Sequence, residues 1–194
     1  MTRMGLRQLD RWLVVLTTTA VWGCADQLPA GPNLPGAART PDTAAFARSP
    51  DLGSCDSLRV PETSQLALHA FASGVQIYQW NGASWTFVAP QATLYADTQY
   101  HGVLGTHYAG PTWESTSGGK VVAASVNRCP ADASSIPWLL LQTVSTTGPG
   151  IFERVTFVQR LNTVGGNAPG SPGTTVGETA NVPYTAEYYF YRAK

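Results

Sequence analysis

The chain has 194 residues, a length typical of one domain with additional segments. Its 12 Lys and Arg residues balance its 12 Asp and Glu residues, and charged residues make up only 12% of the sequence, about half of the usual roughly 25%. Because there is no net charge and no basic patch, the composition argues against a nucleic-acid binder, and no nucleic-acid partner is expected.

The first 23 residues have the pattern of an export signal. Three arginines form a basic start, and an apolar run over residues 12–21 follows, too short to span a membrane. The run ends in Val21-Trp22-Gly23-Cys24, which resembles the lipobox of bacterial lipoproteins. We therefore expect residues 1–23 to be a signal peptide and Cys24 to carry lipid that anchors the protein in a membrane of the bacterial cell envelope. The alternative is a plain secretory signal and a secreted protein.

Residues 24–54 are expected to form a disordered tether behind the lipidated cysteine. This stretch is rich in Pro, Ala and Gly and shows neither helical nor strand periodicity. As a flexible coil it would reach on the order of 30 Å. The folded domain is expected to occupy residues 55–194.

The chain has three cysteines, an odd number for an exported protein. If Cys24 carries lipid, Cys55 and Cys129 remain to form one disulfide in an oxidising compartment. The alternative is two free thiols.

Short strands separated by turn residues dominate the folded domain. The expected strands cover residues 65–72, 74–80, 84–89, 100–109, 112–115, 120–126, 137–144, 151–161 and 184–191. No long helix is indicated. The pattern predicts an all-β fold, a single antiparallel β-sandwich or barrel-like domain.

Four features set the expected turns and ends of these strands. Ser73-Gly74 is expected to be a turn, and Asn81-Gly82 predicts a hairpin with a type I′ turn. Pro90 is expected to end its strand. A long Gly/Pro-rich loop is expected from residue 162 to about residue 183, before the last strand, which is aromatic and should be covered on both faces.

Six strings together resemble one known family. They are GVQIY (74–78), APQATLY (89–95), GTHYAGPTWE (105–114), IPWLLL (136–141), QRLNTVGG (159–166) and VPYTA (182–186). In this order they are similar to the domain of unknown function 3455 family, secreted proteins of bacteria and fungi, over about residues 60–194. The resemblance implies export and a single β-rich domain, and it implies no activity.

The segment 105–114 concentrates more potential chemistry than any other part of the chain. Gly110 before Pro111 favours a sharp turn. We expect a rigid corner in which either Tyr108 or Trp113 packs inward while the loop presents His107.

The candidate ligand-binding residues lie in this segment and at the start of the long loop. They are His107, Tyr108, Trp113, Glu114, Arg160 and Asn162. Turn-placed aromatics such as Trp80 and Trp85 favour a sugar or apolar ligand. The sequence thus indicates a non-catalytic envelope lipoprotein whose β-domain binds a ligand or partner, a cell-envelope glycan or protein among them. A core role for most of the aromatics is the alternative.

A metalloprotein or hydrolytic enzyme centred on His107 and Glu114 is the second hypothesis. His69, His101 and His107 are candidate ligands for copper or zinc, although no cofactor is the main expectation. The alternative for His107 is a hydrogen bond that fixes the Gly110-Pro111 turn. Glu114, Glu153 and Glu187 are candidate acids for glycoside hydrolysis, which needs two carboxylates.

The lipid anchor is tested by the substitution Cys24→Ala. The variant is expected to lose lipidation and to accumulate as soluble or uncleaved protein, because only a cysteine thiol at this position can be acylated. Fractionation and mass measurement of the wild-type and variant proteins check this. A variant that stays membrane-bound with wild-type mass and processing would contradict the lipobox interpretation.

Overall fold

The computed structural model of the protein describes residues 49–194. The predicted signal peptide, Cys24 and most of the predicted tether lie outside the described residues.

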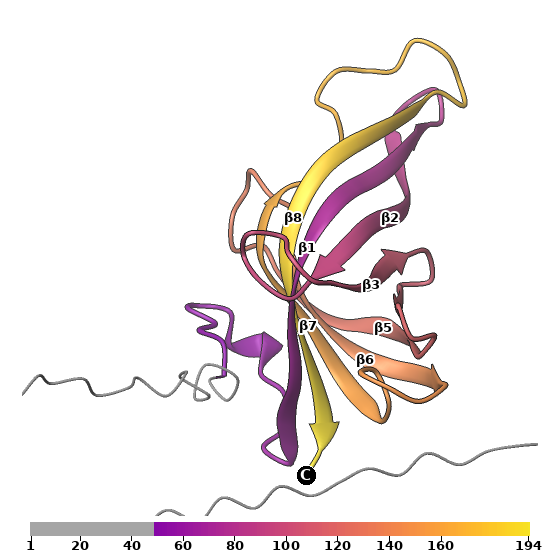
Figure 1. Ribbon diagram of the computed structural model, residues 1–194. Helices are drawn as coiled ribbons and strands as arrows, with labels where there is room; N and C mark the ends of the chain where they lie inside the picture. The colour runs from indigo at the N-terminus through magenta and orange to yellow at the C-terminus, as the bar shows by residue number, and fades with distance from the viewer. Residues whose placement is uncertain (1–48) are drawn as a thin grey trace, which may run out of the picture. The chain divides into compact units, whose positions relative to one another are not determined.

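The described residues form one closed barrel of eight antiparallel strands (Figure 1). Each strand pairs with the next one along the chain, and β8 pairs back with β1. The elements are the 3₁₀ helix η2 (Asp56–Leu58) and the strands β1 (Ser64–Trp80), β2 (Trp85–Tyr95), β3 (Val103–Tyr108), β4 (Thr112–Ser115), β5 (Lys120–Cys129), β6 (Trp138–Thr147), β7 (Val155–Gly165) and β8 (Thr179–Ala193). The predicted all-β antiparallel fold is confirmed, as a barrel rather than a sandwich.

The last strand shows how alternating side chains build two cores. Tyr188 and Phe190 point into the barrel and are fully buried among its interior aromatic and aliphatic side chains. Tyr189 and Tyr191 point to the outer face, yet they are also buried. The predicted cover on both faces of this aromatic strand is therefore confirmed.

The outer core is covered by the segment that precedes β1. Leu52, Cys55 and Leu58 are buried against outward side chains of the barrel that include Leu161 and Tyr191. Leu52 belongs to the stretch expected to be tether, so ordered packing begins before the predicted boundary at residue 55.

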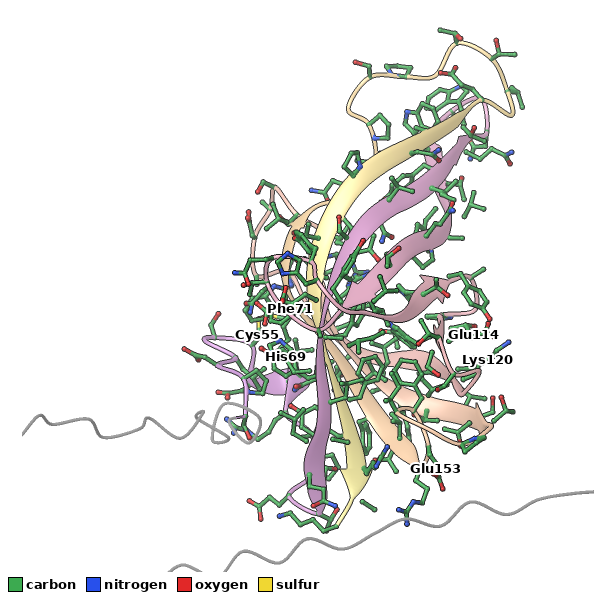
Figure 2. The ribbon with its side chains drawn as sticks, in the orientation of Figure 1. Cys55, His69, Phe71, Glu114, Lys120 and Glu153 are labelled. Carbon is green, nitrogen blue, oxygen red and sulfur yellow. A yellow bond between two sulfur atoms is a disulfide. The ribbon has the colours of Figure 1, made fainter. Side chains whose placement is uncertain are left out.

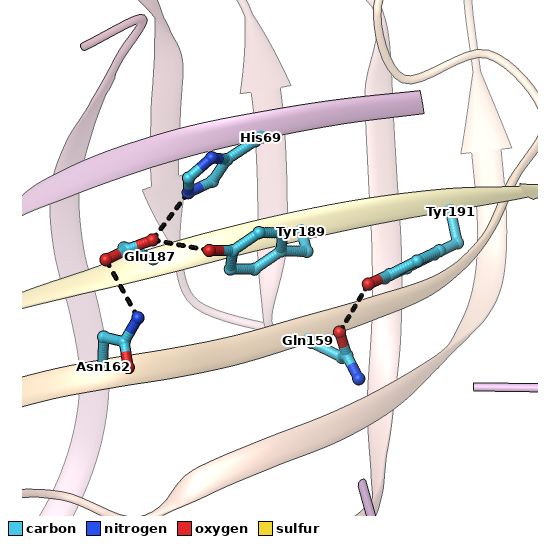
Figure 3. A network of polar contacts seen from close by, with 6 residues as sticks. All are labelled: His69, Gln159, Asn162, Glu187, Tyr189 and Tyr191. Carbon is cyan, nitrogen blue, oxygen red and sulfur yellow. Dashed lines mark hydrogen bonds and ion pairs between the residues drawn. The ribbon is translucent and has the colours of Figure 1, made fainter. Parts of the chain in front are cut away.

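This covering segment is fastened to the barrel by a disulfide and by a glutamine. Cys55 and Cys129 form a disulfide across a separation of 74 residues, as predicted. Closing so long a loop stabilises the fold by about 4 kcal/mol in the chain-entropy account. Gln159 donates from Nε2 to the Leu58 carbonyl at 2.7 Å, while its Oε1 accepts the Tyr191 hydroxyl at 2.7 Å (Figure 3).

The predicted turn at Ser73-Gly74 is wrong, because β1 runs without interruption from Ser64 to Trp80. A Cβ at position 74 would overlap the Gln91 carbonyl oxygen and the Ala92 Cα of β2. Gly74 is needed where the backbones of two paired strands come close together, and not because the chain reverses there.

The predicted hairpin at Asn81-Gly82 is confirmed, but its turn is longer than type I′. Four residues separate β1 from β2, only Gly82 of the Asn-Gly pair has a positive φ (98°), and the Asn81 side chain accepts the Ser84 N–H at 2.8 Å. Pro90 does not end β2, which continues to Tyr95. Pro90 lies close to a register shift between β1 and β2, a setting that tolerates proline within a strand.

The long loop is shorter than predicted and covers residues 166–178, because β7 continues to Gly165 and β8 begins at Thr179. It lies beside the β1–β2 hairpin (Figure 1). The Trp85 indole N–H donates to the Ser171 carbonyl at 2.9 Å, and a Cβ at Gly173 would overlap the Trp80 ring. Trp80 and Trp85 therefore pack against this loop.

The close approach at Gly74 is tested by Gly74→Val, with Ser73→Val as the matched control on the opposite face of β1. We expect Gly74→Val to destabilise the protein by about 3 kcal/mol or more, since the new side chain overlaps the β2 backbone. Ser73→Val should change the free energy of unfolding by less than about 1 kcal/mol. Denaturant unfolding measures both, and equal effects would contradict the interpretation.

Candidate functional site

The hairpin of β3 and β4 divides the segment 105–114 between the two faces of the barrel. His107 pairs in register with Trp113, and both side chains are buried inside. Their rings stack with centroids 4.4 Å apart and planes 8° from parallel. Gly110, with a φ of 111°, turns the chain between the strands. Trp113 is thus the aromatic that packs inward, and the expectation that a loop presents His107 is wrong, because His107 belongs to β3.

The ring of His107 is neutral and has a defined tautomer. Nδ1 lies 2.9 Å from the Thr112 carbonyl oxygen, which can only accept, so Nδ1 carries the proton and Nε2 has a free lone pair. Burial lowers the pKa of His107 to about 3, and the positive charge of Arg160 acts in the same direction. At neutral pH His107 is therefore a hydrogen-bond acceptor at Nε2 and not a cation.

A cavity of about 430 Å³ lies next to these two rings inside the barrel. Apolar side chains form most of its walls, among them Ile136, Leu139 and Leu141. Phe87 and Val88 also line it and are about half exposed, at 51% and 54%, so the cavity opens to solvent beside β2. The aromatic core fills part of the barrel interior, and its members Trp113 and Tyr188 also line this open pocket.

Several polar side chains also line the cavity. Arg160 enters from β7 and donates from Nη2 to the Pro137 carbonyl at 2.8 Å. Gln76 of β1 and Tyr188 of β8 also line the cavity. Burial raises the pKa of Tyr188, and the charge of Arg160 opposes this effect. The cavity therefore combines apolar walls with a guanidinium, an amide, a phenol and a neutral imidazole.

Of the six candidate ligand-binding residues, His107, Trp113 and Arg160 meet at this cavity. Tyr108 and Glu114 alternate with the two ring residues and lie on the outer face. The Tyr108 hydroxyl donates to Glu114 at 2.6 Å, and Lys120 forms an ion pair with the same carboxylate at 3.2 Å (Figure 2). Those two interactions lower the pKa of Glu114.

Asn162 lies on the outer face in a network around Glu187 (Figure 3). It has a φ of 50° beside a register shift in β7 and donates to Glu187 Oε1 at 3.0 Å. His69 Nε2 and the Tyr189 hydroxyl each lie 2.7 Å from Glu187 Oε2, and the His69 ring stacks on Tyr189 at 4.0 Å. These contacts, His69 first, lower the pKa of Glu187 to about 2.

The three histidines occupy three separate environments. His69 contacts Glu187 outside the barrel, His101 contacts Asp97 in an exposed loop, and His107 lies inside. Within residues 49–194 no group of three or more His, Cys, Asp or Glu side chains is placed to hold a metal ion. The three candidate acids are equally dispersed: Glu114 and Glu187 belong to different outer networks, and Glu153 lies in the turn before β7 and not on a strand.

Sequence reasoning missed much of the cavity, including Gln76, Tyr188 and the 136–141 walls. Gln76 is one of several polar residues on β1, and only the inward alternation with Ala70, Ala72 and Tyr78 distinguishes it. This alternation identifies Gln76 as a cavity residue only after the fold has shown that the barrel interior contains a cavity.

Comparisons with known proteins give a family and nothing more. A family model described as "Protein of unknown function (DUF3455)" matches residues 61–192. Searches of the curated proteins and of the solved structures found no match. In the part of the chain that the structure describes, no helix is long and apolar enough to cross a membrane.

The outer network makes stability depend on pH through Glu187. The pKa of Glu187 is depressed from 4.5 to about 2, so its contribution is complete above pH 4.5 and is lost as the pH falls toward 2. At pH 7 Glu187→Gln should be less stable than wild type by on the order of 1–3 kcal/mol, because three donors lose a charged acceptor. Thermal melts from pH 7 to about pH 3 should show this difference shrinking. A difference that stays constant would contradict the assignment.

Proposed function

The chain belongs to the DUF3455 family, and we propose from the geometry of its barrel that it is an exported, non-catalytic protein that binds a small organic molecule inside the barrel. The observation that carries this proposal is the cavity of about 430 Å³, mostly apolar and open to solvent. Ligand sites commonly measure about 300–1,000 Å³ and combine apolar walls with a few polar groups. Eight-stranded barrels have interiors that are either filled by side chains or able to hold one small ligand.

Binding is better supported than catalysis by the groups around the cavity. A histidine with a pKa of about 3 is a weak general base at neutral pH. None of the described residues that line the cavity is Asp or Glu, so the two carboxylates of a glycoside hydrolase are lacking there. His107 and Glu114, the proposed centre of an enzyme or metal site, lie on opposite faces of the β3–β4 hairpin.

The place of action we propose is the bacterial cell envelope, with a lipid anchor on Cys24. The lipobox-like string supports the anchor, and the Cys55–Cys129 disulfide is in keeping with an oxidising compartment. Trp80 and Trp85 pack against the 166–178 loop and do not form an open platform for a glycan, so the barrel cavity is the site that we propose.

The proposal is tested with a neutral fluorescent probe, N-phenyl-naphthylamine. We use the full chain with Cys24→Ala, so that no acyl chain or detergent competes. The probe should bind saturably with blue-shifted emission, because the cavity removes its rings from water. Ser125→Phe, which adds a ring at the cavity wall, should weaken binding by about tenfold or more, equivalent to about 1.4 kcal/mol.

Ala124→Phe is the matched control, since its side chain is exposed and is not part of the cavity wall. It should bind the probe like the parent protein. Absence of saturable binding, or equal losses in the two variants, would contradict a ligand site inside the barrel.

A further inference from the structure

The charge inside the barrel identifies a class of ligand, an inference that rests on the proposed function. Arg160, which is partly buried, and Arg128, which is exposed, both line the cavity, and no Asp or Glu of the described residues does. Neither arginine forms an ion pair with a carboxylate in residues 49–194. The cavity is therefore electropositive.

Arg160 lies within the barrel without a compensating anion. Its charge acts on His107, Tyr78, Tyr184 and Tyr188, all of which are buried or largely buried. Burial raises the pKa of Tyr184 and of Tyr188, so both phenols are neutral at ordinary pH and neither supplies a negative charge. Arg160 is partly buried, and a partly buried charge without an anionic partner is stabilised by an anion that arrives with a ligand.

Unused hydrogen-bond donors gather at the same place. Five buried side-chain polar atoms in residues 49–194 have no hydrogen-bond partner, and three of them belong to residues of this cavity: Gln76 Nε2, Trp113 Nε1 and Arg160 Nε. Gln76 is only 2% exposed and Trp113 is fully buried. Leaving a buried donor unsatisfied costs about 1–3 kcal/mol. Because these three atoms are closed to solvent, they make the wall of the cavity more polar without contacting its contents, and the guanidinium of Arg160 is the group that can meet a ligand.

The apolar walls of the cavity indicate the chemistry of the part of the ligand that lies away from Arg160. The walls include Ile136, Leu139 and Leu141, whose side chains have no polar groups. A free inorganic anion would leave these apolar side chains in contact with water. An organic molecule with one anionic group satisfies both parts of the cavity. We propose that the barrel binds organic acids, with a carboxylate or sulfonate against Arg160 and an apolar body against the aliphatic wall.

Two probes that share one ring skeleton test this. Anilinonaphthalene sulfonate carries an anionic group, and N-phenyl-naphthylamine lacks it. With the full chain carrying Cys24→Ala, the sulfonate probe should bind about tenfold or more tightly than the neutral one. Arg160→Met should remove that preference by weakening the sulfonate probe at least about tenfold while leaving the neutral probe within about twofold.

Two further variants separate a local effect from a general one. Arg59→Met removes the same charge at an exposed position outside this cavity and should leave both affinities unchanged. Arg160→Lys keeps the charge without the planar guanidinium and should retain an intermediate preference. As an independent readout, naphthoate should displace the sulfonate probe from the parent protein and naphthamide should not.

Each outcome decides between the two proposals. If the parent protein binds both probes equally, or if Arg160→Met and Arg59→Met weaken the sulfonate probe alike, the organic-acid inference is overturned while the ligand site stands. If the parent protein binds neither probe, the proposed function itself is overturned. If Arg160→Met does not fold, the affinity ratio of the parent protein and the naphthoate displacement still decide the question.

Discussion

The pairing of the first strand with the last holds this protein together. β1 and β8 run antiparallel from Ser64↔Ala193 to Gln79↔Thr179, which closes the sheet into a barrel. Closure creates an inside, and every inward side chain then faces others from across the barrel. Both the aromatic core and the barrel cavity depend on this ladder, because neither is formed by any single hairpin.

The barrel interior is used in two ways. Trp113, Tyr188 and Phe190 fill one part and contact one another through edge-on rings at 5.4 and 5.8 Å from Trp113. The neighbouring part is hollow and contains Arg160 together with donors that have no partner. A protein selected for stability alone would fill this space with aliphatic side chains. Retaining a guanidinium there has a cost in stability, which the proposed ligand would offset.

Several residues could be interpreted from the sequence because the relevant physics is local. The aromatic content of residues 184–191 predicted a strand, Asn81-Gly82 predicted a hairpin, and the two cysteines left after Cys24 predicted the disulfide. Gly74 was misinterpreted because a glycine in a turn and a glycine beside a close neighbouring backbone look alike in one dimension. Pro90 and Pro183 were taken as strand ends, although both lie within long barrel strands.

The sequence alone indicated the strand-rich composition, a candidate pairing of Cys55 with Cys129 by elimination, and the concentration of chemical groups in residues 105–114, since each depends on which residue types occur and not on how they are arranged in space. Only the tertiary structure decided which of the chemical groups meet. His107, Trp113 and Arg160 converge because β7 faces the paired strands β3 and β4 across a closed barrel, while Tyr108, Glu114 and Asn162 point outward. That division depends on register, because moving a strand by one residue exchanges its two faces, and register is settled by pairing between strands far apart in the chain.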